Sequence, residues 1–348
     1  MKKILQDLTF TEIEEYILSL GEKKFRAKQL YEGLLQGKSV TAISSLSHAL
    51  KERILQDCEN EPIRIKHTFY SSDGTEKYLF ELADGNIIEG VLMKYKYGYT
   101  QCVSTQVGCR MGCKFCASTL NGLVRNLTAG EILSQILLVN ALHKDEVQGK
   151  GAQARAVTNV VLMGSGEPLD NYENVVRFLR NICSENGFGM SARNISLSTC
   201  GLVPKMYQLA EENIPLNLTV SLHATDDISR ARTMPVAKAY KIADILKACE
   251  YYFEKTGRRY YFEYTLIAGE NCDEAHTDAL IKLLKGKPCH INLIRLNEVK
   301  ERDLKALGDK DAYRFLGRLE KGGLSATLRR QIGVDIGGAC GQLRNSYL

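Results

Sequence analysis

The chain has 348 residues, of which 44% are apolar and 25% charged, and its formal net charge is +5. This composition excludes an intrinsically disordered chain, and the length is sufficient for one large domain and a smaller one. The chain has no apolar stretch as long as the ~20 residues of a membrane span, and Asp7 precedes any apolar run. We therefore expect a cytoplasmic protein without a membrane segment or export signal.

Residues 1–60 are predicted to form a small helical domain. Residues 25–36 and 46–58 carry apolar residues at helical spacing, and Thr11 with Glu14 predicts a capping box for an earlier helix. The segment 23–28 interleaves lysine and arginine with an aromatic residue, a pattern that suits phosphate contacts and base stacking.

The next two segments are predicted to be β-rich. Residues 61–98 contain short alternating runs separated by turn residues, which predict a small antiparallel connector that carries Glu89. In residues 99–348, buried-strand runs alternate with helical segments, which predicts an α/β fold with a partial (βα)6 barrel. The six predicted strands are 102–105, 159–163, 194–198, 216–222, 260–267 and 290–294.

Three cysteines follow the first predicted barrel strand at Cys-x3-Cys-x2-Cys spacing: Cys109, Cys113 and Cys116. Eleven cysteines in a cytoplasmic protein favour free thiols for metal binding or catalysis over a disulfide scaffold. Structural zinc and iron-sulfur clusters both normally take four protein ligands. The absent fourth ligand indicates that a substrate or cofactor completes the site, and a closed zinc site is the alternative.

Polar residues also follow the later strands, where parallel barrels build their sites. They are Ser165-Gly166-Glu167, Ser198, Ser221-Leu222-His223 and Asn297. Gly164 and Gly166 favour a cofactor that lies close to the backbone. Each of these residues alone would be an ordinary strand-end residue.

These motifs, with 335–336 and 339–343, together resemble the RlmN/Cfr family of radical S-adenosylmethionine (SAM) RNA adenosine methyltransferases over nearly the whole chain. The resemblance implies that the three cysteines hold one 4Fe-4S cluster, and that SAM serves as methyl donor and radical source. It assigns SAM binding to Gly166, Glu167, Ser198, Ser221, Leu222, His223 and Asn297.

The resemblance also implies the catalytic residues. Cys340, in a loop of small residues, would first accept a methyl group from SAM, and the resulting S-methyl group would be coupled to the RNA. Cys102 would release the product through a transient disulfide with Cys340, and Glu89 would accept a proton. From the residues alone, Glu89 could be an outward strand carboxylate and Cys102 a core residue.

The substrates implied are an adenosine of 23S rRNA, methylated at C2 in the peptidyl-transferase region, and an anticodon-loop adenosine of some tRNAs. An electron donor such as flavodoxin or ferredoxin would be a partner, and the enzyme would be a monomer. Residues 1–60 would be an accessory domain that recognises RNA. Two alternatives remain: Cfr-like methylation at C8, which Arg295 favours, and a non-catalytic zinc-bound RNA-binding protein. Ser165, Cys200, Gly337 and Gly338 depart from the family pattern and bear on rate.

Overall fold

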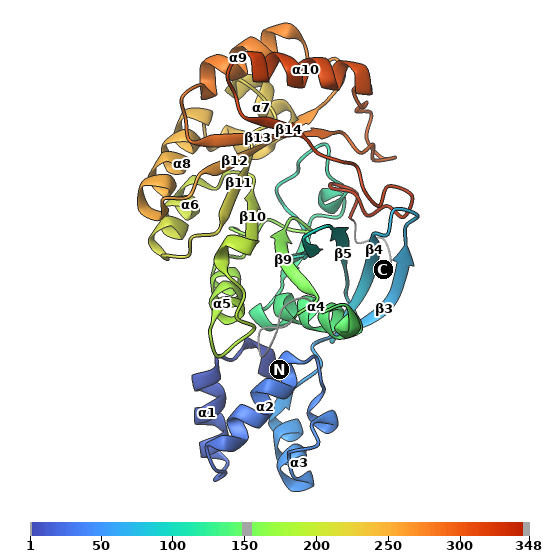
Figure 1. Ribbon diagram of the computed structural model, residues 1–348, viewed down its shortest axis with the longest axis vertical. Helices are drawn as coiled ribbons and strands as arrows, with labels where there is room; N and C mark the ends of the chain where they lie inside the picture. Colours follow the sequence, from blue (N-terminus) through green and yellow to red (C-terminus); the bar gives the residue numbers. More distant parts are fainter. Residues whose placement is uncertain (1, 148–154, 344–348) are drawn as a thin grey trace.

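The computed structural model describes residues 2–147 and 155–343, and all structural statements refer to these residues. The chain is elongated, with the N-terminal helices at one end and the barrel above them (Figure 1). Single-turn 3-10 helices, among them Leu5–Asp7 and Ala117–Thr119, connect the larger elements.

The N-terminal domain contains helices α1 (Phe10–Ser19), α2 (Phe25–Leu35) and α3 (His48–Asp57). Strands β1 (Lys3–Ile4) and β2 (Cys58–Glu59) pair in parallel and bring its two ends together. Apolar side chains at helical spacing on the three helices form a separate core. A helical domain in this region is therefore present, as the sequence predicts.

The start of α1 differs from the sequence prediction. Thr9 rather than Thr11 caps the helix, with Glu12 rather than Glu14 completing the capping box. Both pairs have the required spacing, so the sequence alone does not separate them. The tertiary structure favours the first pair, because the Glu12 carboxylate also accepts a hydrogen bond from Arg177 of the barrel at 2.5 Å.

Asp7 and Arg177 fasten the N-terminal domain to two barrel helices. The Asp7 carboxylate accepts a hydrogen bond from the Gly130 amide in the first turn of α4 (Ala129–Leu142). Its carbonyl accepts one from Arg177 of α5 (Tyr172–Cys183) at 2.7 Å. The two domains are thus joined by specific polar contacts.

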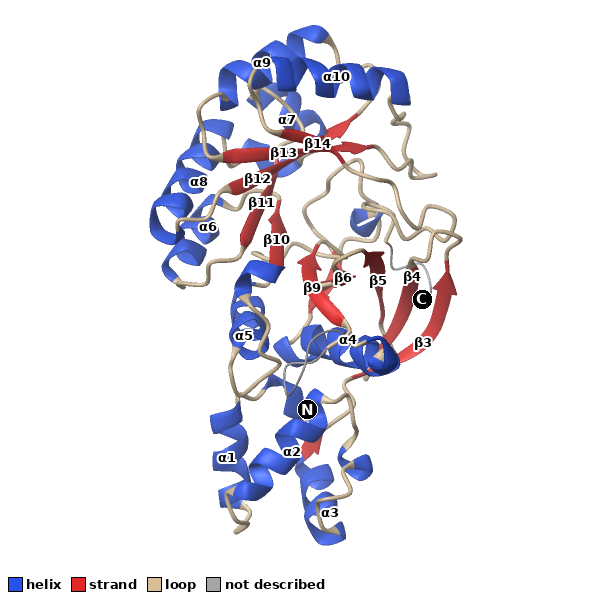
Figure 2. Cartoon of the chain, in the orientation of Figure 1, coloured by secondary structure: helices blue, strands red, loops and turns tan. Residues whose placement is uncertain are grey.

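The rest of the molecule is built around a single ten-stranded sheet. Its strand order is β14-β13-β12-β11-β10-β9-β6-β5-β4-β3 (Figure 2). Its strands are β3 (Ile63–Tyr70), β4 (Glu76–Leu82), β5 (Ile87–Tyr95), β6 (Gly98–Cys102), β9 (Val157–Leu162), β10 (Ile195–Thr199), β11 (Asn217–Ser221), β12 (Tyr260–Leu266), β13 (Cys289–Arg295) and β14 (Ala326–Leu328). The small hairpin of β7 (Gln106–Gly108) and β8 (Leu123–Asn126) stands apart from it.

The six predicted barrel strands are present as β6 and β9 to β13, and they run parallel. Two details were wrong. The first strand ends at Cys102 instead of beginning there, and β14 adds a parallel strand that the sequence prediction omitted. The residues on both sides of Cys102 are a similar mixture of polar and apolar types and are all buried, and β14 has only three residues, so hydrophobic pattern locates neither boundary.

The β connector is continuous with the barrel. Strands β3, β4 and β5 pair antiparallel with one another, and β5 pairs with β6. The helices lie on the outer face of the curved sheet and include, besides α4 and α5, α6 (Val203–Glu211), α7 (Asp227–Thr233), α8 (Ile242–Thr256), α9 (Glu274–Leu284) and α10 (Asp309–Lys321). The main apolar core fills the space between sheet and helices, which leaves the inner face for chemistry.

None of the helices in the described ranges has both the length and the apolar character needed to cross a membrane.

Candidate active site

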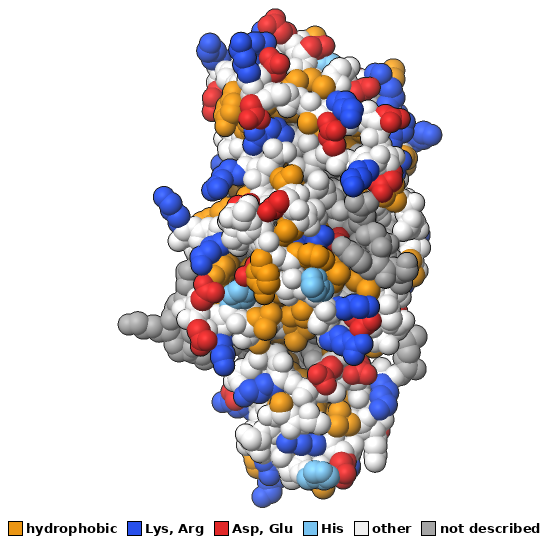
Figure 3. Space-filling view, turned by 90° about the vertical axis from the view of Figure 1, so that its right-hand side faces the viewer, with side chains coloured by type: hydrophobic (Ala, Val, Ile, Leu, Met, Phe, Trp, Pro, Cys, Tyr) orange, Lys and Arg blue, Asp and Glu red, His pale blue; other side chains and the backbone are white. Residues whose placement is uncertain are grey.

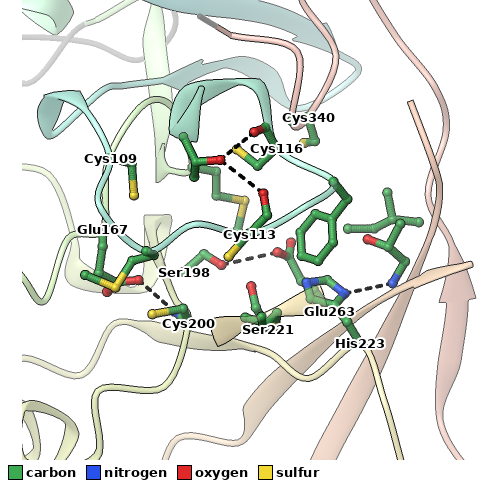
Figure 4. A pocket seen from close by; sticks show the side chains of 18 of the residues that line it. Cys109, Cys113, Cys116, Glu167, Ser198, Cys200, Ser221, His223, Glu263 and Cys340 are labelled. Carbon is green, nitrogen blue, oxygen red and sulfur yellow. Dashed lines mark hydrogen bonds between the residues drawn. The ribbon is translucent and has the colours of Figure 1, made fainter. Parts of the chain in front are cut away.

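The three cysteines of the Cys-x3-Cys-x2-Cys motif line one cavity at the carboxyl ends of the barrel strands (Figure 4). Their loop joins β7 to β8, and the Thr119 hydroxyl lies within hydrogen-bonding distance of the carbonyls of Cys113 and Cys116. The cavity has a volume of about 150 Å³. The structure therefore brings Cys109, Cys113 and Cys116 together.

Burial raises the pKa of each of these thiols, to about 12 for Cys109. Thiolates in this environment need a positive charge, which bound metal supplies. Three thiols around a shared cavity suit a cluster with several irons.

Glu167 lies on the same cavity and is almost fully buried, with an exposed fraction of 4%. Burial raises the pKa of its carboxyl group, while hydrogen bonds to the carboxylate from the amides of Cys200, at 2.7 Å, and Leu169, at 3.0 Å, oppose the rise. A buried carboxylate requires a compensating partner. An ammonium group such as that of SAM would supply one.

His223 faces the cavity as a neutral imidazole. Burial lowers its pKa to about 3, and Nδ1 accepts a hydrogen bond from the Thr265 amide at 2.9 Å. The proton is therefore on Nε2, the nitrogen that is free to donate. Phe115 of the cysteine loop packs edge-on against the ring, with centroids 4.6 Å apart.

Gly166, Ser198, Ser221 and Asn297 also line this cavity, whereas Leu222 does not. The Leu222 side chain is fully buried in the main core, and its carbonyl accepts a hydrogen bond from Arg230. The structure therefore does not bring the Leu222 side chain to the site. The sequence resemblance assigned a position whose side chain packs away from the cavity.

Gly164 and Gly166 are needed for packing of the backbone. The sequence analysis had instead attributed them to a cofactor that lies close to the backbone. A Cβ atom at Gly166 would approach the Gln106 amide nitrogen to 2.8 Å, and one at Gly164 would approach the Val103 carbonyl to 2.7 Å. Gly166 also has a φ of +111°. Close packing of two backbone segments therefore requires these glycines, whatever the cavity binds.

Arg230 of α7 is a buried residue that the sequence analysis missed. Its guanidinium donates to the carbonyls of Leu222 at 3.1 Å, Cys200 at 2.7 Å and Ser221 at 2.9 Å. Cys200 follows β10, Ser221 is the last residue of β11 and Leu222 comes next, so Arg230 binds two segments that carry part of the cavity wall. An arginine in a short amphipathic helix gives no sequence signal of this role.

A second cavity of about 250 Å³ adjoins the first, and Cys340 lines both. Cys102 lines the second cavity together with Met93, Tyr95, Val161 and Met163. Cys340 is exposed, as its small-residue loop predicts, and Cys102 is buried; both are free thiols. The Cys340 residue is exposed, but its thiol lies against the protein where the two cavities meet, so burial raises the pKa of both thiols and each needs local help to ionise.

Arg329 and Glu263 connect the two cavities and were not predicted. Arg329 lines the second cavity and Glu263 the first, and they form an ion pair at 2.9 Å. Glu263 also accepts a hydrogen bond from Ser198 at 3.2 Å. Arg329 lies near Cys340, and its positive charge lowers the pKa of that thiol against the effect of burial.

Glu89 is on β5, and it lines neither cavity. Its buried carboxylate pairs with Lys77 of β4 at 3.2 Å. The alternative of an outward strand carboxylate is wrong, because Glu89 is 2% exposed. The pair lies beside the loop that carries Cys340, since a Cβ atom at Gly337 would approach the Lys77 ammonium nitrogen to 3.6 Å.

A partial parallel barrel with a three-cysteine loop at the carboxyl ends of its strands defines the class of radical SAM enzymes. The family model described as the radical SAM superfamily matches residues 103–281. A second one, the N-terminal domain of ribosomal RNA large subunit methyltransferases, matches residues 4–59.

Similar proteins extend over the whole chain. A probable dual-specificity RNA methyltransferase RlmN of Lachnospira eligens is 47% identical, covering 99% of this chain and 96% of its own. The probable dual-specificity RNA methyltransferase RlmN of Clostridium perfringens is 49% identical, and the match covers 100% of this chain and 98% of that protein. The crystal structure of a radical SAM methyltransferase from Sphaerobacter thermophilus superposes with a TM-score of 0.94 at 39% identity, covering 99% of this chain and 100% of its own.

This chain belongs to the RlmN family of radical SAM RNA methyltransferases. The predicted family, fold class and enzymatic activity are confirmed, and the superfamily implies an iron-sulfur cluster and SAM. The alternative of a non-catalytic zinc-bound protein is wrong.

Proposed function

We propose that this enzyme methylates C2 of one adenosine in the peptidyl-transferase region of 23S rRNA and of an anticodon-loop adenosine in some tRNAs. The observation that carries the proposal is the position of Cys340, which lines both cavities and shares the second with Cys102. One thiol can therefore face a methyl donor on one side and a target base on the other.

The first cavity suits the cofactors. Cys109, Cys113 and Cys116 would hold one 4Fe-4S cluster, and SAM would complete it, with Glu167 binding its amino group. The bound cofactors would supply the methyl group for Cys340 and the one-electron chemistry that activates it afterwards. An external electron donor, such as flavodoxin or ferredoxin, is part of this proposal.

The second cavity suits the target nucleotide. Its lining is partly apolar, with Met93, Val161 and Met163, and among the described residues it includes Arg329 and Arg330 but no acidic residue. An apolar surface favours a base removed from its stack, and arginine favours the phosphates that flank it. The family's substrates contain both groups.

Two thiols in one cavity also support product release. After Cys340 has joined the RNA, attack by the Cys102 thiolate on its sulfur would form a Cys102–Cys340 disulfide as the carbon-sulfur bond breaks, and the released carbon would keep the bonding electron pair and take up a proton to become the methyl group. Glu89 would accept a proton, and its carboxylate lies 3.2 Å from the Lys77 ammonium nitrogen.

We assign RNA recognition to the N-terminal domain. Lys23, Lys24 and Phe25 are exposed, and the Arg26 guanidinium lies 4.8 Å above the Phe25 ring. On the face shown in Figure 3, basic side chains are spread along the molecule and interspersed with acidic ones rather than gathered in one patch. Changing Lys23 and Lys24 to glutamate should weaken RNA binding and lower its salt dependence, while Cys340 is still methylated.

The deciding experiment is mass spectrometry of nucleosides from rRNA and tRNA of cells that lack or express the protein. We expect 2-methyladenosine in both RNAs only when the protein is present. Finding 8-methyladenosine alone would establish the Cfr-like reaction and overturn the C2 assignment. Absence of both, with a loaded cluster, would overturn the proposed substrates.

A further inference from the structure

The loop that carries Cys340 is fastened on both sides of the cysteine. On its carboxyl side, the Gly341 carbonyl accepts a hydrogen bond from the Ala117 amide at 2.8 Å, and the Leu343 carbonyl one from Ser118 at 2.7 Å. The Asn297 side chain donates to the Cys340 carbonyl at 2.9 Å. The loop that carries Cys109, Cys113 and Cys116 thus holds the carboxyl-terminal side of the Cys340 loop.

The other side is held by a turn some 260 residues earlier in the chain, between β3 and β4. Asp335 accepts hydrogen bonds from the Ser71 hydroxyl at 2.6 Å, the Ser72 amide at 3.1 Å and the Ser72 hydroxyl at 3.2 Å. The Asp73 carboxylate accepts one from the Gly333 amide at 2.9 Å. We call Ser71, Ser72 and Asp73 the clamp turn.

The clamp turn and the segment around Gly333 are packed closely where they meet. A Cβ atom at Gly333 would approach a methyl group of Thr75 to 3.0 Å. Burial would raise the pKa of Asp73, but hydrogen bonds, including those from Thr75 and Gly333, lower it to about 2, so this carboxylate is ionised at neutral pH. The contact is therefore specific and does not depend on Asp335 alone.

Between this contact and Cys340 lie Gly337 and Gly338, and Gly337 has a φ of +61°. The amides of Gly337 and Gly338 donate to the carbonyls of Val334 at 3.1 Å and Gly333 at 2.7 Å, so this stretch folds back onto the residue that Asp73 holds. The position of Cys340 relative to the two cavities then depends on how its neighbours are fastened. Reactions at a thiol are sensitive to displacements of ~1 Å, which can cost ~100-fold in rate.

We propose that the clamp turn is a positioning element for Cys340, acting through Asp335 to keep the thiol between the two cavities and within reach of Cys102. This inference rests on the proposed function for its biological purpose. The geometry that it describes is measurable without RNA.

The test is the rate at which Cys102 and Cys340 form a disulfide in the cluster-loaded protein. The oxidant is diamide, which takes up the two electrons and two protons that the thiols lose, and peptide mapping by mass spectrometry identifies the product. The Ser71→Ala/Ser72→Ala variant and the Asp335→Ala variant should each react about tenfold more slowly than wild type. Combining the three changes should slow the reaction no further than Asp335→Ala, because both sides of the same bonds are removed.

Matched controls separate positioning from damage. Ser71→Thr keeps the hydroxyl and should react like wild type, as should Ser191→Ala, which removes an exposed turn serine far from the loop in sequence. Iron content, visible absorption and thermal unfolding should be unchanged in all variants. S-methylation of Cys340 should fall in the variants that lose the clamp contact.

Disulfide formation in the Ser71→Ala/Ser72→Ala and Asp335→Ala variants at rates within twofold of wild type, or faster than wild type, would overturn the proposal. Additive effects of the serine and aspartate changes in the combined variant would also overturn it. Failure of the wild type to form the disulfide would also overturn it, since the thiols would not be within reach. Failure of the proposed function would look different: the disulfide results would hold while no methylated adenosine appeared.

Discussion

Replacing Arg230 by methionine tests whether the cavity wall is held by a buried guanidinium. Arg230 is fully buried and donates hydrogen bonds to three carbonyls at the ends of β10 and β11. Each buried carbonyl that loses its donor costs about 1–3 kcal/mol. Removing the buried charge recovers several kcal/mol of desolvation free energy. We therefore expect the free energy of unfolding to fall by about 3 kcal/mol in Arg230→Met.

That loss is a large share of the ~5–15 kcal/mol by which domains are usually stable. It should appear in anaerobic urea unfolding followed by circular dichroism at matched iron content. SAM affinity, measured by equilibrium dialysis, should fall at least about tenfold, since the wall segments lose their common anchor. Arg232→Met, an exposed position on the same helix, is the control. A stability within ~1 kcal/mol of wild type together with unchanged SAM affinity would refute the reasoning.

Three further predictions concern the cysteines and one histidine. Alanine at Cys109, Cys113 or Cys116 should abolish iron binding and the brown colour expected of a cluster; stoichiometric iron in any of them would contradict the assignment. Cys102→Ala should trap RNA on Cys340 under turnover conditions, visible as a shifted band on denaturing gels, and Cys102→Ala/Cys340→Ala should show none. Hydrogen bonds that His143 donates to the carboxylate of Glu76, and then to that of Glu146, raise the pKa of its imidazole, so its stabilising effect should be complete below pH ~6.5 and disappear as pH rises through the higher folded-state pKa. Urea unfolding from pH 5 to 9 should show this loss in wild type and not in His143→Gln.

Much of the fold was predictable because its signals are local. Alternation of buried strands and helices identifies the parallel barrel, and the spacing of Cys109, Cys113 and Cys116 identifies the loop at its mouth. Strand ends were less predictable, since the residues on both sides of Cys102 are a similar mixture of polar and apolar types. Thr9 and Thr11 likewise carry the same capping signal, and only the contact of Glu12 with Arg177 distinguishes them.

The sequence by itself determined the family, the cysteine loop and the alternation of strands and helices in the barrel, because each depends on residues close together in the chain or on motifs in a set order. The tertiary structure decided the rest. It placed Cys340 between two cavities, paired Glu89 with Lys77, and brought the clamp turn to Asp335. These contacts join strands and loops that are distant in sequence, and their free energy depends on side-chain geometry across the barrel, which no local pattern encodes.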